Sequence, residues 1–536
     1  MKIAQVNTYD ISGGAAIASY RLHQGMVALG QDSTLLVRWK ASDNPTVQSV
    51  STQNTEVALN EPTWATIQQR YLNQNRTARS RTYFSFSYPG FDLSRLDTVT
   101  QADIINLHWV AAFQSPTTLA KLLTLGKPVV WTLHDMAPFT GGCHYTAGCN
   151  GFEQACAQCP QLRDDPFALP AATLQDKLEQ VSRFRNLTIV TPSRWLADCA
   201  RHSRVFQQCR VEVIPYALDT ELFAPVPKAE AKRQLGIAPE TFTLVAQSTP
   251  EPRKGFADLL ATLRQCAQHP DMAQLIARNA ITLLVYGRPC PELEQFPIPH
   301  VHLGWKSTPA DLIETYSAAD VLVLPSFEDN LPNVMLEAMS CGTPVLAFGV
   351  GGMPDAIQHQ QTGWLIPFGN FEQLGQQIIH CAINPTQYEA MRETCRQHML
   401  LNYAAPLESK RYLELYGDLK RHTPPLPVIP AGTRPQKPME QAATEVGVRS
   451  DRELGAIAPL DLSMGASVGQ LYQSMLMHSL MQEANHYKQL AKQAQVLATE
   501  LEAKQQRIAA METSKFWLLR SRWFQLKRRL GLPVDE

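Results

Sequence analysis

Short apolar runs alternate with helix-length segments from residue 2 to about residue 370. Polar residues rarely interrupt these runs, which is typical of parallel strands covered by helices on both faces. Before residue 217 the runs are KIAQVNT, STLLVRW, DIINLHW, PVVWTLHD, NLTIVTPS and VEVIP; after it they are FTLVAQST, TLLVYGR, VHLGW, VLVLPS and PVLAFGV. The pattern predicts an α/β protein with two doubly wound domains in tandem.

The junction between the two domains is predicted in IPYALDTELFAPVP, residues 214–227, where a strand ends and three prolines follow. We expect a first domain over residues 1–217, a second over 218–400 and a closing helix over 401–422. Ligands of open α/β sheets bind outside the carboxyl ends of the strands. The strand ends that face the cleft between the domains are therefore the expected site.

After residue 422 the pattern changes. The stretch TPPLPVIPAGTRPQKP places six prolines in sixteen residues and predicts a stiff linker over residues 423–465. Residues 466–512 are expected to form a long helix with an apolar seam, interrupted once by a polar residue. The seam comprises Met477, Leu480, Ala484, Tyr487, Ala491, Ala494, Ala498, Leu501, Gln505 and Ile508. It permits a coiled coil that joins copies of the chain through 477–508, or a lone amphipathic helix docked on its own protein.

The last segment, residues 513–536, is a basic amphipathic tail. Its cations are Lys515, Arg520, Arg522, Lys527, Arg528 and Arg529, and its apolar residues are Phe516, Trp517, Leu519, Trp523, Phe524, Leu526 and Leu530. A helix would carry an aromatic face beside a basic face, the pattern of an anchor on an anionic membrane surface. A helix packed on the protein, with its charges in solvent, is the alternative.

Composition narrows the class of protein. Apolar residues make up 44% and charged residues 18% of the chain, and the formal net charge of −1 argues against nucleic acid as a partner. The N-terminus has no apolar run of about seven residues, so no signal peptide is expected. No window offers the roughly 18 consecutive apolar residues of a membrane span. We therefore expect a cytoplasmic protein, peripheral on the inner face of the membrane if its tail is an anchor.

Eleven cysteines in 536 residues do not indicate a disulfide scaffold. Four of them, Cys143, Cys149, Cys156 and Cys159, fall within CHYTAGCNGFEQACAQC. Either four thiolates hold a structural zinc ion, or four reduced thiols pack in a loop beside the active centre. The spacing of Cys156 and Cys159 suits zinc, whereas the interval between Cys143 and Cys149 is wider than usual.

Two segments that follow predicted strands suit phosphate binding. Gly13 and Gly14 open a helix, whose free amide hydrogens favour an anion, although many such turns use glycine only to turn. The full three-glycine dinucleotide fingerprint is missing here. In STPEPRKGF, Arg253 and Lys254 place a guanidinium beside an ammonium, which suits a diphosphate. A solvated basic turn is the alternative for this pair.

A third segment, FEDNLPNVMLEAMSCGTPVLA, supplies carboxylates. Glu328 and Asp329 precede a predicted helix, and Glu337 lies within its first turns. Paired carboxylates often perform acid/base chemistry. Because these acids face the Arg-Lys turn, we interpret them instead as positioning groups, with the Glu337 carboxylate accepting two hydrogen bonds from a ribose diol.

At these residues the chain resembles a known family. The segment PSFEDNLPNVMLEAMSCGTPVLAFGVGGMPD is similar to the E-x7-E region of the retaining glycosyltransferases of family four, which have the two-Rossmann GT-B fold. Further similar segments, in the same order over about residues 1–420, are SGGAA, TLHDMAPFTGGCHY, VTPSRW, VIPYALDTELF, PRKGF, VHLGW and GGMPD. The chain resembles bacterial surface-polysaccharide glycosyltransferases in particular, and its linker and tail lie outside the family core.

The resemblance implies a role for each matched residue. The donor-binding residues would be Gly13, Gly14, Arg253, Lys254, Glu328, Asp329, Asn330, Leu331 and Glu337. Glu337 would bind the ribose of the donor, and Arg253 and Lys254 its diphosphate. The loop at Asp329 would contact the transferred sugar, and His134 would line the active centre against that sugar. The catalytic set is therefore His134, Arg253, Lys254 and Asp329.

Two positions depart from the family pattern. Asp329 stands where a first Glu is usual, with Glu328 one residue earlier, so the resemblance leaves open which acid reaches the sugar. Tyr216 replaces an asparagine that is common in the turn after the last strand of the first domain. There is no Asp-x-Asp motif in the sequence, which agrees with chemistry that needs no metal cofactor.

The activity implied is that of a retaining hexosyltransferase. It would move a sugar from a nucleotide-diphosphate sugar to a glycan or lipid-linked glycan in cell-surface polysaccharide synthesis. The departing phosphate would accept the acceptor's proton, while the cations stabilise the charge growing on the diphosphate. A sugar-nucleotide epimerase of the same fold and a non-catalytic membrane scaffold remain as alternatives, because fold alone does not decide function.

Overall fold

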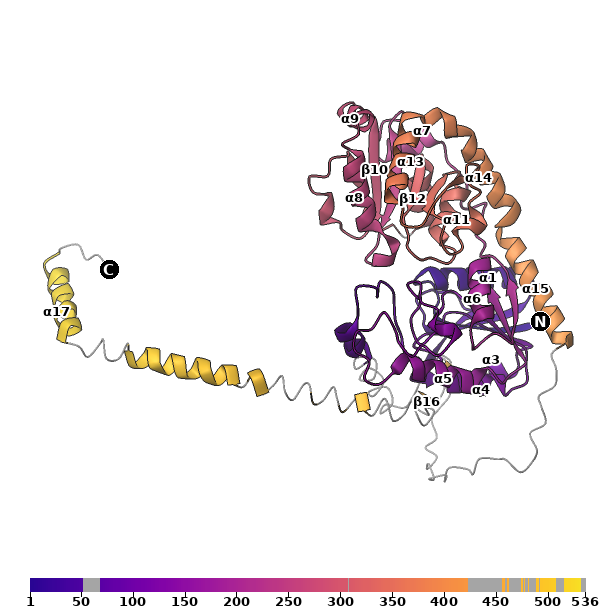
Figure 1. Ribbon diagram of the computed structural model, residues 1–536, viewed down its shortest axis with the longest axis horizontal. Helices are drawn as coiled ribbons and strands as arrows, with labels where there is room; N and C mark the ends of the chain where they lie inside the picture. The colour runs from indigo at the N-terminus through magenta and orange to yellow at the C-terminus, as the bar shows by residue number, and fades with distance from the viewer. Residues whose placement is uncertain are drawn as a thin grey trace, which may run out of the picture. The chain divides into compact units, whose positions relative to one another are not determined.

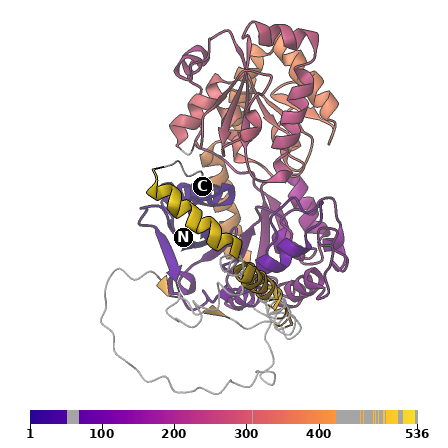
Figure 2. The same cartoon turned by 90° about the vertical axis from the view of Figure 1, so that its left-hand side faces the viewer.

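The computed structural model describes residues 1–51, 68–306, 308–422, 456–457, 460–461, 474–475, 477, 481, 488–490, 492–507 and 515–531. The chain separates into two compact units, Met1–Gly469 and Gln470–Glu536. The first unit contains two parallel sheets with helices on both faces (Figure 1 and Figure 2). The predicted α/β class with two doubly wound domains is confirmed, whereas the domain limits drawn from the sequence stay predictions.

The first sheet has the strand order β15-β3-β2-β1-β5-β6-β7-β8, and all its pairings are parallel. Its strands are β1 (Lys2–Tyr9), β2 (Asp32–Trp39), β3 (Val47–Ser51), β5 (Ile104–Leu107), β6 (Val129–Thr132), β7 (Leu187–Thr191), β8 (Arg210–Val213) and β15 (Ala456–Ile457). The order reverses between β1 and β5, and such a switch point is where open sheets bind ligands. The glycine loop follows β1 at this point.

The first sheet is packed between helices. These are α1 (Gly14–Ala28), α3 (Asp97–Thr100), α4 (Pro116–Leu123), α5 (Leu169–Val181) and α6 (Arg194–His202). The residues of β5 and β6 are all buried, which explains why these strands appear as uninterrupted apolar runs. A small antiparallel pair, β4 (Gly90–Phe91) with β16 (Leu460–Asp461), lies apart from the sheet.

The second sheet has the order β11-β10-β9-β12-β13-β14, again with parallel pairings. Its strands are β9 (Phe242–Ser248), β10 (Ile281–Gly287), β11 (His300–His302), β12 (Val321–Leu324), β13 (Val345–Phe348) and β14 (Gly363–Ile366). Its helices are α7 (Lys228–Gln234), α8 (Phe256–Cys266), α9 (Pro270–Ala277), α10 (Pro309–Ala318), α11 (Asn333–Ser340), α12 (Met353–Ala356), α13 (Phe371–Ile383) and α14 (Glu389–Asn402). The switch point lies between β9 and β12, so the loops after these two strands are neighbours.

One helix returns to the first sheet. Helix α15 (Ala405–His422) follows the second domain in sequence but packs on α1 (Figure 1). The Tyr412 hydroxyl lies 2.9 Å from the Thr132 hydroxyl, and the Asn106 amide donates to the Tyr416 hydroxyl at 2.7 Å. The last helix of this unit therefore completes the polar contacts of strands β5 and β6.

The second unit contains helical residues at 488–490 and 492–507, followed by α17 (Lys515–Arg529). The predicted seam residues Leu480, Ala484, Tyr487, Ala491 and Ile508 lie outside the described residues, as does most of the predicted linker. The described seam residues are all solvent-exposed: Met477, Ala494, Ala498, Leu501 and Gln505. Within the described part of the chain, no helix is both long and apolar enough to cross a membrane.

Candidate active site

The loops after β9 and β12 form the donor-side cluster, which we define as Arg253, Lys254, Glu328, Asp329 and Glu337. Arg253 and Lys254 lie on the turn after β9, a 3-10 helix at Pro252–Lys254. The turn ends at Gly255 with φ +69°, and a Cβ there would lie 2.1 Å from the Pro325 carbonyl oxygen of the loop after β12. Glycine at this position thus allows the two loops to touch.

The two cations of the turn meet Asp329. The Lys254 ammonium lies 2.5 Å from Asp329 Oδ2, and Arg253 Nη1 lies 3.5 Å from Oδ1. Burial acts to raise the pKa of Asp329, but Lys254 and Arg253 outweigh it and lower the pKa below its ordinary value. Asp329 is therefore an ionised carboxylate that fixes both cations.

Glu328 points the other way, toward the first domain. Its Oε1 accepts a hydrogen bond of 2.9 Å from the Ala147 amide. Burial raises the pKa of Glu328, while the Ala147 amide and Arg253 oppose that rise. Arg253 also lies over the ring of Tyr145, 4.6 Å from its centroid, so the loop at 145–147 receives two residues from the second domain.

Glu337 projects from α11 toward α1 of the first domain. Its Oε1 accepts a hydrogen bond of 2.8 Å from Arg21 Nη2, and its Oε2 lies 3.5 Å from the Tyr316 hydroxyl. Near the start of the same two helices, Asn333 Nδ2 donates to the Gly14 carbonyl at 3.0 Å. Gly13 precedes α1 with φ +95°, a conformation that glycine adopts without strain. The predicted glycine loop and ribose acid thus lie on two helices that touch.

Asn330 and Leu331 are buried between the domains. The Asn330 amide donates to the His134 carbonyl oxygen at 3.1 Å, and Asn330 Oδ1 accepts from the Ser193 hydroxyl at 2.6 Å. Gly352 donates from its backbone amide to the Asn330 carbonyl at 2.7 Å, and a Cβ at Gly352 would lie 2.3 Å from that oxygen. The small residues of GGMPD therefore let a neighbouring loop pack on the Asn330 backbone.

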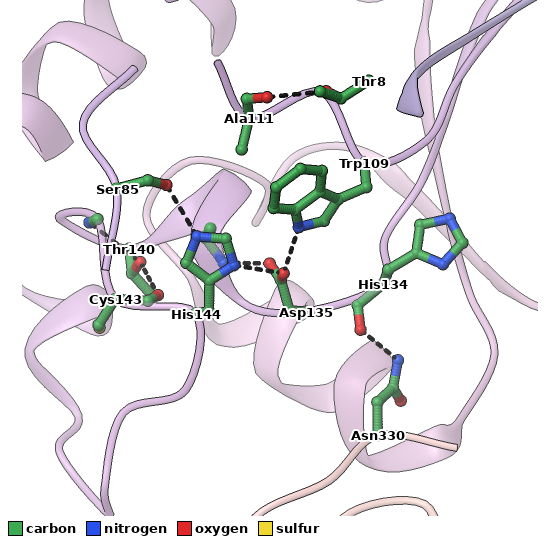
Figure 3. A network of polar contacts seen from close by, with 12 residues as sticks. Thr8, Ser85, Trp109, Ala111, His134, Asp135, Thr140, Cys143, His144 and Asn330 are labelled. Carbon is green, nitrogen blue, oxygen red and sulfur yellow. Dashed lines mark hydrogen bonds and ion pairs between the residues drawn. The ribbon is translucent and has the colours of Figure 1, made fainter. Parts of the chain in front are cut away.

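The ring of His134 is occupied within the protein. Its Nδ1 lies 2.6 Å from the Tyr216 hydroxyl and its Nε2 lies 3.2 Å from His108 Nδ1. Burial lowers the pKa of His134 to about 4, so the ring is neutral near pH 7. Figure 3 shows the main-chain carbonyl of His134, and not its ring, directed at Asn330.

A cavity of about 50 Å³ that opens to solvent is lined by His134 and other residues of the first domain, and we call it the acceptor-side cavity. Its wall consists of Ser85, Phe86, Ser87, His108, Trp109, Val110, Ala111, Gln114, Pro116, Leu119, Trp131, His134, Asp135, Ala137, Pro138, Lys177 and Val181. Lys177 donates to the Ala137 and Thr140 carbonyl oxygens, and burial lowers its pKa to about 8. A lining of aromatic and aliphatic side chains with a few polar groups is typical of small-molecule sites.

A chain of hydrogen bonds stiffens the wall of this cavity (Figure 3). His144 Nδ1 lies 2.6 Å from Asp135 Oδ2, and His144 Nε2 lies 2.8 Å from the Ser85 hydroxyl. The Trp109 indole also donates to Asp135, at 2.9 Å. Burial acts to raise the pKa of Asp135, but His144 and these donors lower it. Because an ionised carboxylate only accepts, His144 donates from Nδ1 to Asp135.

Comparisons with known proteins match both domains of the chain. The profile described as "Glycosyltransferase Family 4" covers residues 12–222, and the one described as "Glycosyl transferases group 1" covers residues 240–384. The chain belongs to glycosyltransferase family four. These two matches include both sides of the site described above.

Two curated relatives of this family-four chain are D-inositol 3-phosphate glycosyltransferases. The one from Kribbella flavida is 29% identical over 206 residues, which is 36% of this chain and 47% of the relative. The one from Actinosynnema mirum is 30% identical over 196 residues, 34% of this chain and 46% of the relative. The chain thus spans about half the length of the curated relatives it matches.

Solved structures agree on the fold of the family-four chain. HepE from Anabaena, in complex with UDP and glucose, has a TM-score of 0.52 and 18% identity, covering 78% of this chain and 99% of that one. Sucrose-phosphate synthase from Thermosynechococcus elongatus has a TM-score of 0.53 and 17% identity, covering 78% and 98%. Both are similar in the two-domain GT-B architecture.

The four clustered cysteines of the family-four chain surround one small pocket, together with Phe84 and Thr140. All four are free thiols, and burial raises the pKa of Cys156 to about 11. Over the described residues, no three or more His, Cys, Asp or Glu side chains are arranged to hold a metal ion. Cys143, Cys149, Cys156 and Cys159 lie around the same pocket, and of the two alternatives, zinc or reduced thiols, this geometry does not favour zinc.

Several residues of the site were missed by sequence reasoning. Ser85, Asp135 and His144 line or support the acceptor-side cavity, and Arg21 contacts Glu337. Asp135 directly follows His134 in the sequence HD, a signal that could have been used. Arg21 had no such signal, because its partner is 316 residues away.

Proposed function

We propose that this chain is a retaining hexosyltransferase that transfers a sugar from a nucleotide-diphosphate sugar to a glycan or lipid-linked glycan in cell-surface polysaccharide synthesis. The observation that supports this most is the donor-side cluster. Arg253 and Lys254 from the loop after β9 pair with Asp329 from the loop after β12, and Glu337, the acid proposed for the ribose, lies on the helix that follows Asp329. Family membership supports the same activity.

In this proposal Arg253 and Lys254 bind the donor diphosphate, and Asp329 holds both cations in place. Glu337 accepts hydrogen bonds from the ribose hydroxyls; a carboxylate has about four lone-pair positions, and only two of those on Glu337 face protein donors. The backbone at Asn330 and Leu331 faces the transferred sugar, and Gly13 and Gly14 let the donor approach α1. Glu328 fastens the loop after β12 to the first domain.

The acceptor sugar is proposed to lie in the acceptor-side cavity, where Trp109 and Trp131 offer apolar surface and Ser85 a hydroxyl. Its own hydroxyl attacks from the face that the nucleotide leaves, and the departing phosphate takes the proton. The protein contributes orientation and positive charge, so the chemistry needs no metal. His134 contributes a neutral, fixed wall through Tyr216 and His108.

A thermal-shift panel of UDP-, GDP-, ADP- and CDP-sugars tests the donor proposal. A ligand at 100 times its dissociation constant stabilises the folded protein by about 2.7 kcal/mol. At least one member should raise Tm; no shift with any of them would reject the proposal. Conversion of the bound sugar nucleotide to an epimer without an acceptor would favour the epimerase instead.

The tail is proposed to hold the enzyme on an anionic membrane surface, at the inner face of a membrane. Leu519, Trp523 and Leu526 on α17, and Leu530 just after it, are 68%, 56%, 48% and 64% exposed. They recur at intervals of three and four residues and so form one stripe along the helix. Neighbouring arginines supply the attraction to anionic lipid.

Co-sedimentation with vesicles tests this anchor. The full chain should bind vesicles that contain phosphatidylglycerol and not vesicles of phosphatidylcholine alone. Deleting residues 514–536 should abolish binding, and the double change Trp523→Ser with Leu526→Ser should weaken it while leaving the charge unchanged. Undiminished binding by the deletion variant would reject the anchor.

Two further proposals concern assembly and the thiols. The exposed seam residues between 477 and 508 are proposed to join copies of the chain. In sedimentation the full chain should have the mass of more than one copy, whereas a variant ending at residue 422 should have the mass of one copy.

The cysteine loop is tested by metal analysis. About one equivalent of zinc per chain would establish a structural zinc site, and less than about half would leave reduced thiols.

A further inference from the structure

Arg21 is a cation of the first domain that forms an ion pair with Glu337 of the second domain. It lies on α1, and its side chain is 17% exposed. Its Nη2 donates to Glu337 Oε1 at 2.8 Å, and its guanidinium lies 5.5 Å from the ring centroid of Phe223. One guanidinium therefore rests on an aromatic ring and reaches the carboxylate that we assign to the ribose.

The other terminal nitrogen of Arg21 has no such partner. Arg21 Nη1 is buried and makes no hydrogen bond with any residue in the described part of the chain. A buried donor without a partner costs stability, so most of them in folded proteins are satisfied. An unsatisfied guanidinium nitrogen beside the ribose acid indicates a place where a ligand supplies the missing acceptor.

We propose that Arg21 is a nucleotide-binding residue that completes the donor site from the first domain. Nη2 orients the Glu337 carboxylate, and Nη1 donates to an oxygen of the nucleoside diphosphate. The planar fork of arginine suits this double task, because its donors diverge in fixed directions that a lysine ammonium cannot reproduce. The inference rests on the proposed function, since it takes a nucleotide as the ligand.

This role couples donor binding to the contact between the two domains. Arg21 belongs to α1 and Glu337 to α11, so a nucleotide that touches both is held by both domains at once. Binding energy at this point then favours the arrangement in which the acceptor-side cavity and the donor-side cluster are adjacent. A residue that only joins the two domains would stabilise their contact equally with and without the nucleotide.

A second arginine provides the matched control. Arg194 at the start of α6 also reaches across to the second domain, and its Nε lies 2.9 Å from Asp355 Oδ1. Its side chain is 75% exposed, and both its recorded contacts to Asp355 are complete without a ligand. Arg194→Ala thus removes a charge pair between the same domains without touching the ribose acid.

The experiment is calorimetric titration with UDP, GDP, ADP and CDP. Arg21→Ala should raise the dissociation constant of the tightest-binding nucleotide at least tenfold, which corresponds to about 1.4 kcal/mol. Arg21→Lys should also raise this constant, although lysine retains the charge. Arg194→Ala should leave the constant within about twofold of wild type. Thermal unfolding of each variant shows whether it is folded, and Arg21→Lys carries the test if the alanine variant is not.

A second background separates direct binding from positioning. In the Glu337→Gln variant, replacing Arg21 should still lower the affinity for the nucleotide, because Nη1 contacts the nucleotide independently of Glu337. If the second change caused no further loss of affinity, Arg21 would only position Glu337, and the proposed direct contact would be overturned. Equal affinities of wild type, Arg21→Ala and Arg21→Lys would overturn the inference while leaving the proposed function intact. Failure of the wild type to bind any of the four nucleotides would overturn both.

Discussion

The donor-side cluster and the acceptor-side cavity are built differently, although His134 lines the cavity and also contacts Asn330, which follows Asp329 of the cluster. In the cluster, charged groups pair with one another: Lys254 and Arg253 with Asp329, and Arg21 with Glu337. In the cavity wall, hydrogen bonds run from Ser85 through His144 to one carboxylate, Asp135. The cluster holds several charged groups close together, whereas the cavity is lined mainly by aromatic and aliphatic side chains.

The two sides differ in the interactions within the protein that a ligand would have to replace when it binds. In the proposed function a diphosphate competes with Asp329 for Arg253 and Lys254, so the site gains only the difference between two strong interactions. In the acceptor-side cavity, the hydrogen bonds of Asp135 are made to His144, Trp109 and the Ala137 amide. We therefore expect selectivity for charge on the donor side and selectivity for shape on the acceptor side.

The strongest way to break the donor side is Arg253→Ala. It removes a cation that we propose to face the negative charge growing on the diphosphate, and kcat/KM for transfer should fall about 100- to 1000-fold, as expected for one lost electrostatic contact in an active site. Lys254→Ala should act in the same direction. Steady-state kinetics measures the effect, with the exposed Arg264→Ala as control; near wild-type kinetics would remove the residue from the site.

The corresponding change on the acceptor side is Asp135→Asn. The amide keeps the shape but presents an N–H group where His144, Trp109 and the Ala137 amide all donate. The free energy of unfolding should fall by about 2 to 3 kcal/mol, while nucleotide affinity stays unchanged. Urea denaturation provides the measurement and Asp198→Asn, at an exposed pair, the control. A loss of nucleotide affinity would show that the two sides are not separable.

A buried acid near Arg21 adds a pH test. Burial raises the pKa of Glu408 to about 8 from its ordinary 4.5, and the Ala217 amide and Arg21 only partly oppose this. Between pH 4.5 and 8 the folded chain keeps a proton that the unfolded chain has lost, so this acid reduces stability as pH rises. Glu408→Gln should remove that trend and be more stable than wild type at pH 8 by roughly 1 kcal/mol or more. Parallel urea curves at pH 5 and pH 8 check it, and the same pH trend in both proteins would contradict it.

The smallest effect is expected at Arg194→Ala. Its ion pair with Asp355 is formed by a side chain that is 75% exposed, and such pairs are screened by solvent. Stability should change by less than about 0.5 kcal/mol. Thermal unfolding at low and high salt measures it. If Arg194→Ala lost as much stability as a donor-side variant, the contact between the domains, and not contact with the ligand, would explain the effects of both changes.

The sequence predicted the fold because continuous apolar runs such as IINL and VVWT are what strands buried on both faces require. It also placed Arg253 beside Asp329, since loops that follow two strands at a sheet's switch point meet at one edge. These relations depend only on local pattern and on the rules of parallel sheets.

Other features depend on contacts between distant parts of the chain. Whether Glu328 or Asp329 turns toward the cations depends on Ala147, which offers Glu328 a different partner. The direction of the His134 ring is decided by Tyr216 and His108, the first of which had been noted only as a departure from the family pattern. Local sequence carries no record of such partners, so these orientations could not be predicted.

Some hydrogen bonds of the first sheet can form only after helix α15 has been synthesised. Asn106 and Thr132 leave the ribosome long before Tyr416 and Tyr412, the residues whose hydroxyls contact them. The amino-terminal domain is then made early but finished late, after the whole second domain has been translated. Until that moment its central strands keep buried polar groups short of their final partners, a state in which a nascent chain depends most on chaperones.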